Sequence, residues 1–154
     1  MSTPAREVSA KDLTHRMFDI YNEASYARLS EVLDPDVVVE WPQSKERVRG
    51  LANMKSILEC YPGGPQQPFG EGMQFPETDD QRFRLTPVFK TVETASSEDT
   101  ATSVVKTRYP DGSDWFVVTI AQARGGKLVY LLQYFAPLTE PPEWRAAWVE
   151  YTDA

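Results

Sequence analysis

The sequence has little of the chemistry that marks disulfide-linked or metal-binding proteins. Among 154 residues there is one cysteine, Cys60, and one histidine, His15. A single thiol can form neither an internal disulfide nor a cysteine-based zinc site, and no carboxylate lies at metal-ligand spacing from His15. We therefore expect a chain that folds without disulfides in a reducing compartment, and we predict no metal and no cofactor.

Long apolar runs and basic clusters are also missing. No stretch approaches the ~20 apolar residues of a membrane span, and the first ten residues lack the apolar run of a signal peptide. Lys and Arg number 16 against 23 Asp and Glu, which gives a net charge of −7. An acidic surface repels phosphate backbones. These absences predict a soluble, cytoplasmic protein that binds neither membranes nor nucleic acids.

The pattern of apolar residues predicts one domain over residues 1–154, with a core over about 9–137 and a tail over 138–154. Ser9, followed three residues later by Asp12, predicts the start of a first helix. Three helices are expected to turn the following residues toward the core: Leu13, Met17, Ile20, Tyr21 and Ala24; Tyr26, Leu29, Val32 and Leu33; Leu51, Met54, Ile57, Leu58 and Tyr61.

The rest of the chain is expected to form strands. The β-branched run at 37–41, ended by Pro42, predicts a first strand. Four more are expected at 87–95, 100–109, 115–124 and 127–136, with turns at 109–112 and 124–127. Residues 62–86, rich in Pro, Gly, Gln and acidic residues, are expected to be a long loop, either a lid or a disordered insertion. The order predicts an α+β fold in which three N-terminal helices pack on a strongly curved antiparallel sheet.

Several short motifs carry a resemblance to a known family. They are Asp34-Pro35-Asp36-Val37-Val38, Glu40-Trp41-Pro42, Arg47-Val48-Arg49-Gly50, Gly126-Lys127-Leu128 and Gln133-Tyr134-Phe135. Over most of its length the chain resembles the nuclear transport factor 2-like superfamily and, within it, the SnoaL-like proteins. The resemblance implies a cone around one small-molecule pocket. Its members include isomerases, epoxide hydrolases, dehydratases, cyclases and pure binding proteins, so the fold alone selects no reaction.

The catalytic sets of two resembling enzymes are absent. Aligned with ketosteroid isomerase, the positions of its tyrosine and two aspartates fall on Met17, on Trp41 and near Val118, none of which transfers a proton. Aligned with limonene epoxide hydrolase, the set formed by its water-activating carboxylate, its acid and the arginine that bridges them falls near Val104, Thr102 and Gln133, and its water-holding asparagine falls near Glu40. Neither reaction is predicted.

Three polar residues remain as catalytic candidates. Glu40 lies among apolar neighbours that would raise its pKa toward that of a general base; the alternative is an exposed carboxylate paired with Arg47 or Arg49. Gln133 alternates with Leu131 and Phe135, so it could orient a ligand carbonyl or a water, or form only a structural bond.

The third candidate, Lys106, could pair with Glu40 or hold an anionic ligand, with Tyr21 as an alternative partner; otherwise it is a solvated charge on the outer face. An apolar pocket wall is expected from these residues: Met17, Tyr21, Trp41, Met54, Phe116, Val118 and Phe135.

The resemblance implies a ligand of the polyketide, terpenoid or steroid kind. We expect a protein that binds, and by acid–base chemistry transforms, an apolar oxygen-bearing metabolite. The alternative is a non-catalytic binding or dimerisation module whose catalytic positions have become apolar. The aromatic residues predict a homodimer, since one solvent face should not expose so many: Trp115, Tyr130, Tyr134, Trp144 and Trp148.

Overall fold

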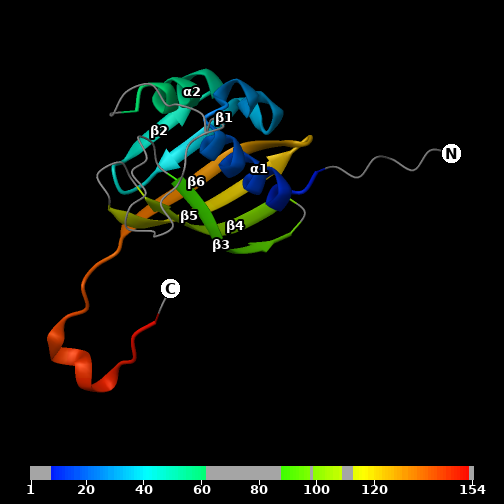
Figure 1. The fold of residues 1–154 in the computed structure, drawn as a ribbon. Coiled ribbons are helices and arrows are strands. Elements are labelled where there is room, and N and C mark those ends of the chain that lie inside the picture. Colours follow the sequence, from blue (N-terminus) through cyan, green and yellow to red (C-terminus); the bar gives the residue numbers. More distant parts are fainter. Residues whose placement is uncertain (1–7, 62–87, 98, 109–112, 153–154) are drawn as a thin grey trace, which may run out of the picture.

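The computed structural model describes residues 8–61, 88–97, 99–108 and 113–152. Within them the elements follow in this order: α1 (Ala10–Glu23), the 3-10 helix η1 (Tyr26–Glu31), β1 (Leu33–Trp41), β2 (Glu46–Arg49), α2 (Leu51–Glu59), β3 (Val88–Ser96), β4 (Thr100–Arg108), β5 (Asp114–Arg124), β6 (Lys127–Pro137) and the 3-10 helix η3 (Glu143–Trp148). Figure 1 shows their arrangement.

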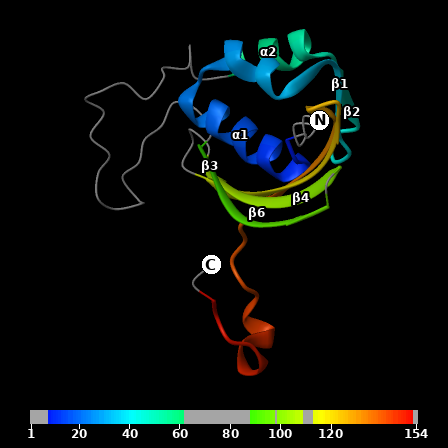
Figure 2. The same cartoon turned by 90° about the vertical axis from the view of Figure 1, so that its right-hand side faces the viewer.

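The six strands form one sheet in the order β2-β1-β6-β5-β4-β3. All neighbours are antiparallel except β1 and β6, which are parallel. The turn between β5 and β6 is made by Gly125 and Gly126, at φ values of 60° and 74° that favour glycine. Figure 2 shows the sheet curving around α1. The predicted α+β fold with a curved, largely antiparallel sheet is confirmed.

The first helix begins as predicted. The backbone N–H of Asp12 donates to the Ser9 side-chain oxygen at 3.2 Å, which satisfies one of the free donors of the helix N-terminus. The helix ends at Ala24, whose φ of 52° is left-handed. The side of α1 turned to the sheet is buried, including Leu13 and Met17.

The predicted second helix is different. Residues Tyr26–Glu31 form a 3-10 helix, so the prediction of three regular helices is not confirmed. Val32 leaves the helix, and its carbonyl accepts from the Leu128 N–H at 2.7 Å. Leu33 already belongs to β1, where it pairs with Leu128 of β6. A longer helix is also disfavoured because Asp34 precedes Pro35, and a residue before proline avoids the helical region.

Helix α2 follows Gly50, whose φ of +88° is a conformation that side chains rarely adopt. Met54 is buried under this helix as expected, whereas Ile57, expected in the core, is 40% exposed. The predicted lid at 62–86 and the turn at 109–112 lie outside the described residues.

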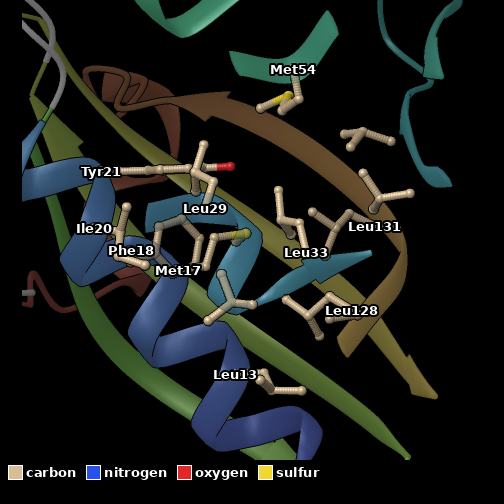
Figure 3. Packing of buried hydrophobic residues seen from close by; sticks show 14 of the residues in the cluster. Leu13, Met17, Phe18, Ile20, Tyr21, Leu29, Leu33, Met54, Leu128 and Leu131 are labelled. Atoms are coloured by element: carbon tan, nitrogen blue, oxygen red, sulfur yellow. The ribbon is translucent and has the colours of Figure 1, made fainter. Parts of the chain in front are cut away.

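The core lies between the helices and the concave side of the sheet. Figure 3 shows Met17 and Phe18 of α1 facing the cluster that includes Leu33, Leu128 and Leu131. Burying each such side chain stabilises the fold by roughly 1.5–3 kcal/mol. Among the described helices, none is long and apolar enough to cross a membrane.

Strand alternation gives the sheet two faces. The inner face is turned to α1 and carries these residues: Val39, Trp41, Ala101, Ser103, Val105, Thr107, Trp115, Val117, Thr119, Ala121, Leu131, Gln133 and Phe135. The outer face carries these: Val38, Glu40, Thr102, Val104, Lys106, Arg108, Asp114, Phe116, Val118, Ile120, Tyr130, Leu132 and Tyr134.

Residues 138–152 leave the sheet as an extended segment that contains η3, here called the C-terminal arm. Every residue of the arm is exposed. Figure 2 shows it on the side of the sheet away from the helices.

Candidate functional site

Four polar side chains stand side by side across the inner face. Ser103 on β4 opposes Thr119 on β5, and Thr119 opposes Gln133 on β6. Glu40 pairs with Leu132 in the parallel β1–β6 ladder, so Trp41 follows beside Gln133. We call Ser103, Thr119, Gln133 and Trp41 the polar row.

Apolar residues border the polar row on both sides. The register places Val105, Val117 and Phe135 along one edge. Along the other edge it places Ala101, Ala121 and Leu131. A polar group in such surroundings is costly unless it is hydrogen-bonded, so the bonds of the row decide what it can do.

Gln133 is the centre of these bonds. Its Oε1 accepts from the Trp41 indole Nε1–H at 2.8 Å, and its Nε2 donates to the Thr119 hydroxyl oxygen at 3.1 Å. The indole only donates, so the amide orientation is fixed: oxygen toward Trp41, nitrogen toward Thr119. One N–H of Gln133 and the O–H of Thr119 remain available to donate further.

The turn between β1 and β2 holds Trp41 in place. The Gln43 Nε2 donates to the Phe135 carbonyl at 2.6 Å, and the Phe135 N–H donates back to the Gln43 Oε1. The rings of Trp41 and Phe135 meet edge to face with centroids 6.3 Å apart. These contacts position the indole beside Gln133.

Two further hydroxyls on β4 are buried with unused hydrogen-bonding capacity. Among the described residues, the Ser103 Oγ and the Thr107 Oγ1 have no hydrogen-bond partner. Tyr21 is also buried, and burial followed by the nearby Tyr26 raises its pKa far above the ordinary value, so its hydroxyl stays protonated. In Figure 3 that hydroxyl points away from α1 into the cluster.

No charged side chain is buried among the residues whose side-chain exposure the structure describes. The buried polar side chains there are Thr14, Ser103, Thr107, Thr119 and Gln133. No cluster of His, Cys, Asp or Glu able to hold a metal occurs among the residues described. The polar row can therefore donate hydrogen bonds to an oxygen atom, and none of its four members is a carboxylate or an imidazole that could transfer a proton.

Glu40 lies on the outer face, not with Gln133. Its Oε1 is 2.8 Å from both Nε and Nη2 of Arg47, and its Oε2 accepts from the Tyr130 hydroxyl at 2.9 Å. The Tyr130 hydrogen bond and then Arg47 lower the Glu40 pKa. The expectation of a raised pKa was wrong, and the alternative of a pair with Arg47 is confirmed.

Lys106 also lies on the outer face, on β4, which is separated from β1 by the two strands β6 and β5. Its Nζ is 4.0 Å from an Asp114 carboxylate oxygen, while Arg108 holds the same carboxylate at 2.7 and 2.9 Å. The structure does not bring Lys106 together with Glu40 or Gln133.

The residues expected in the pocket wall divide between the two faces. Met17, Tyr21 and Met54 belong to the core cluster, and Trp41 and Phe135 border it. Phe116 and Val118 lie on the outer face, so they cannot line the same space.

Two members of the polar row, Ser103 and Thr119, were missed by the sequence analysis. The signal that could have found them is their pairing with the strand that carries Gln133.

No family model matches the sequence, and no curated protein sequence matches it. Solved structures do resemble it. A putative ketosteroid isomerase from Kribbella flavida is 20% identical, with 97% of this chain and 96% of that chain covered and a TM-score of 0.72. An NTF-2 like protein of unknown function from Burkholderia xenovorans is 22% identical, with 93% and 94% covered and a TM-score of 0.69.

An LEH-like epoxide hydrolase from M. tuberculosis is 12% identical, with 85% of each chain covered and a TM-score of 0.61. At these identities the likeness concerns the backbone and not the chemistry. The chain therefore has the fold of NTF2-like proteins, as the motifs of its first strand and last hairpin predicted.

Proposed function

We propose that the protein binds an apolar small molecule bearing a carbonyl or hydroxyl oxygen, between α1 and the inner face of the sheet. The observation that carries this proposal is the uncharged polar row, which retains unused donors and lies between two apolar rows. Ligand sites commonly combine an apolar wall with a few placed polar groups.

In this proposal Gln133 is the anchor, because Trp41 and Thr119 fix its amide and leave one N–H free. The Ser103 hydroxyl is a further donor, because it has no hydrogen-bond partner among the described residues. Met17, Trp41 and Phe135 supply apolar contacts. Structural neighbours are named as a ketosteroid isomerase, an epoxide hydrolase and a polyketide cyclase, which supports a ligand of the steroid, terpenoid or polyketide kind.

The described residues favour binding over acid–base catalysis. Glu40 is ionised, paired with Arg47 and directed to the opposite face from Gln133. Tyr21 keeps its proton throughout the neutral range. We further propose that the protein works in the cytoplasm, as the single cysteine suggests, and as a homodimer.

A matched pair of probes tests the anchor. We expect 2-naphthol to bind about tenfold more tightly than 2-methylnaphthalene, which has a similar shape but no oxygen to accept or donate a hydrogen bond. Probe fluorescence during titration with the protein measures both affinities. Gln133→Leu should abolish the preference while both probes still bind.

The control is Gln122→Leu, the same chemical change at an exposed position of β5. It should leave the preference for 2-naphthol unchanged. Equal affinities of the two probes for the wild-type protein, or an intact preference in Gln133→Leu, would contradict the proposal.

A further inference from the structure

The C-terminal arm exposes more aromatic surface than a free segment in water should. Trp144 is 74% exposed, Trp148 is 79% exposed and Tyr151 is 68% exposed. Concentrated exposed apolar groups of this kind mark interaction sites. The arm therefore needs a partner surface.

Proline keeps the arm away from the sheet of its own chain. The last backbone contact with the body is the Leu138 N–H to the Asp114 carbonyl at 3.1 Å. Pro137, Pro141 and Pro142 then restrict the backbone to extended conformations, as at Pro142 with φ −67° and ψ 137°. A turn back onto the neighbouring outer face would need a tight bend in this stretch.

The outer face supplies the complementary surface. Its central rows pair Val104 with Val118 and Tyr134, and Ile120 with Leu132. These side chains are half-buried, and Tyr134 is 42% exposed. Trp115, which we expected among the exposed aromatics, lies instead on the inner face, where its indole N–H donates to the Ser113 hydroxyl oxygen at 2.9 Å.

The charges of the two surfaces also match. On the outer face, Lys106 and Arg108 share one acid, Asp114. The arm carries Glu140, Glu143 and Glu150 against one base, Arg145. An acidic arm is thus attracted to the basic end of the face.

We propose that the arm of each chain packs on the outer face of the sheet of a second copy, burying Trp144 and Trp148 there. Figure 2 shows that the arm extends into the space beyond this face, where a second copy would lie. At roughly 150–250 Å² per aromatic side chain, the four tryptophans of two exchanged arms bury about 600–1,000 Å², and the surfaces that receive them bury about as much again, which together lies in the range of a stable interface. This inference does not depend on the small-molecule site.

The first test measures the dimer by light scattering over a dilution series. Trp144→Ser with Trp148→Ser should raise the dissociation constant by at least about a hundredfold, since each buried tryptophan acts as a hot spot. The matched control is Ile57→Ser on α2, which is also exposed but lies on the helix side of the sheet; it should leave the constant unchanged. A wild-type protein that stays monomeric at about 100 μM overturns the proposal.

The second test distinguishes exchange of arms from docking within one chain. In a Cys60→Ser background, Ala147→Cys is placed in one chain, and Thr102→Cys, Val104→Cys or Val118→Cys in the other. Mixing and copper-catalysed oxidation should give a disulfide-linked pair with at least one of the three.

Lys55→Cys on α2 replaces the outer-face cysteine as the control, and it should not link to Ala147→Cys. Both cysteines are also placed in one chain. If that chain links only to itself, the arm docks on its own sheet and the proposal is wrong; linkage only to Lys55→Cys also overturns it.

Discussion

Two polar clusters lie on opposite faces of the sheet, and they differ in charge and in contact with water. On the inner face, Gln133 joins Trp41 and Thr119 through uncharged hydrogen bonds. On the outer face, Glu40 joins Arg47 and Tyr130 around a negative charge. Glu40 and Trp41 are adjacent in sequence, so one step along β1 changes both the charge and the solvent access of the cluster.

Of the two clusters, only the inner one has unused hydrogen-bonding capacity that a ligand could satisfy. The Glu40 carboxylate is hydrogen-bonded to Arg47 and Tyr130 and is also in contact with water. Its hydrogen-bonding capacity is therefore satisfied without a ligand. In the inner row, Ser103, Thr119 and Gln133 are buried, and the Ser103 hydroxyl has no partner among the described residues. Unused hydrogen-bonding capacity is valuable to a ligand only where water cannot satisfy it.

The largest effect should come from the apolar side chains of β6. Leu131 is fully buried and the adjacent Leu132 is half-buried on the outer face. We expect Leu131→Ala to lower the free energy of unfolding by about 3 kcal/mol, because it leaves a cavity. Leu132→Ala should cost about 1 kcal/mol or less.

Urea unfolding followed by circular dichroism measures both, at a concentration where light scattering shows a monomer. Equal losses for the two variants would mean that the faces are not as different as the structure describes.

The next effect concerns the polar row. Gln133→Leu removes the acceptor of the Trp41 indole and should cost about 1–3 kcal/mol, since a buried donor is left unpaired. Adding Trp41→Phe removes that donor, so the two losses should sum to more than the loss of the double variant. Urea unfolding of the four proteins completes the cycle. Strictly additive losses would show that the hydrogen bond contributes nothing.

The smallest effect concerns Glu40. Its pKa lies below the ordinary value of 4.5, so ionised Glu40 stabilises the folded state above that pH, and this contribution is lost as the pH falls through the folded-state pKa. Glu40→Gln should therefore flatten part of the loss of stability below about pH 4.5. Urea midpoints at several pH values measure this slope.

Arg47→Gln should flatten the same part of the curve, because it removes the cation paired with Glu40. If the stability of both variants fell with decreasing pH in the same way as that of the wild type, the pairing of Glu40 with Arg47 would be contradicted. Neither variant should alter the preference for 2-naphthol over 2-methylnaphthalene.

Most of the fold could be predicted because local signals agreed with the final packing. The Ser9 cap, the two glycines of the last turn and the alternation of β4 to β6 all act within a few residues. Strand β2 was missed because it has four residues, of which only Val48 is buried. Such a strand exists only because β1 is beside it.

The site could be predicted only in part, because successive residues of a strand point to alternate faces of the sheet, so an error of one residue assigns a side chain to the wrong face. The run Val37–Val38–Val39 is apolar on both faces, so it does not reveal which side Glu40 occupies. If the register at the turn between β5 and β6 continued unchanged along both strands, Gln133 would pair with Val118. A bulge between Gln122 and Ala123 shifts the register, so that Thr119 opposes Gln133 instead. Because of this one extra residue, the partner of Gln133 is a residue of the inner face and not Val118, which lies on the outer face.

The parallel pairing of β1 with β6 has a consequence for synthesis of the chain. Leu33 meets Leu128, and Val39 meets Leu131, although more than half of the sequence separates them. On the ribosome, β1 can pair only with the short strand β2 until β6, the last strand, has emerged. Helix α1 packs on β3, β4, β5 and β6, so its apolar side stays open to water until these later strands emerge. The sheet therefore closes late in synthesis, and we expect folding to be slower and to depend more on chaperones than in a protein whose sheet joins only strands close in sequence.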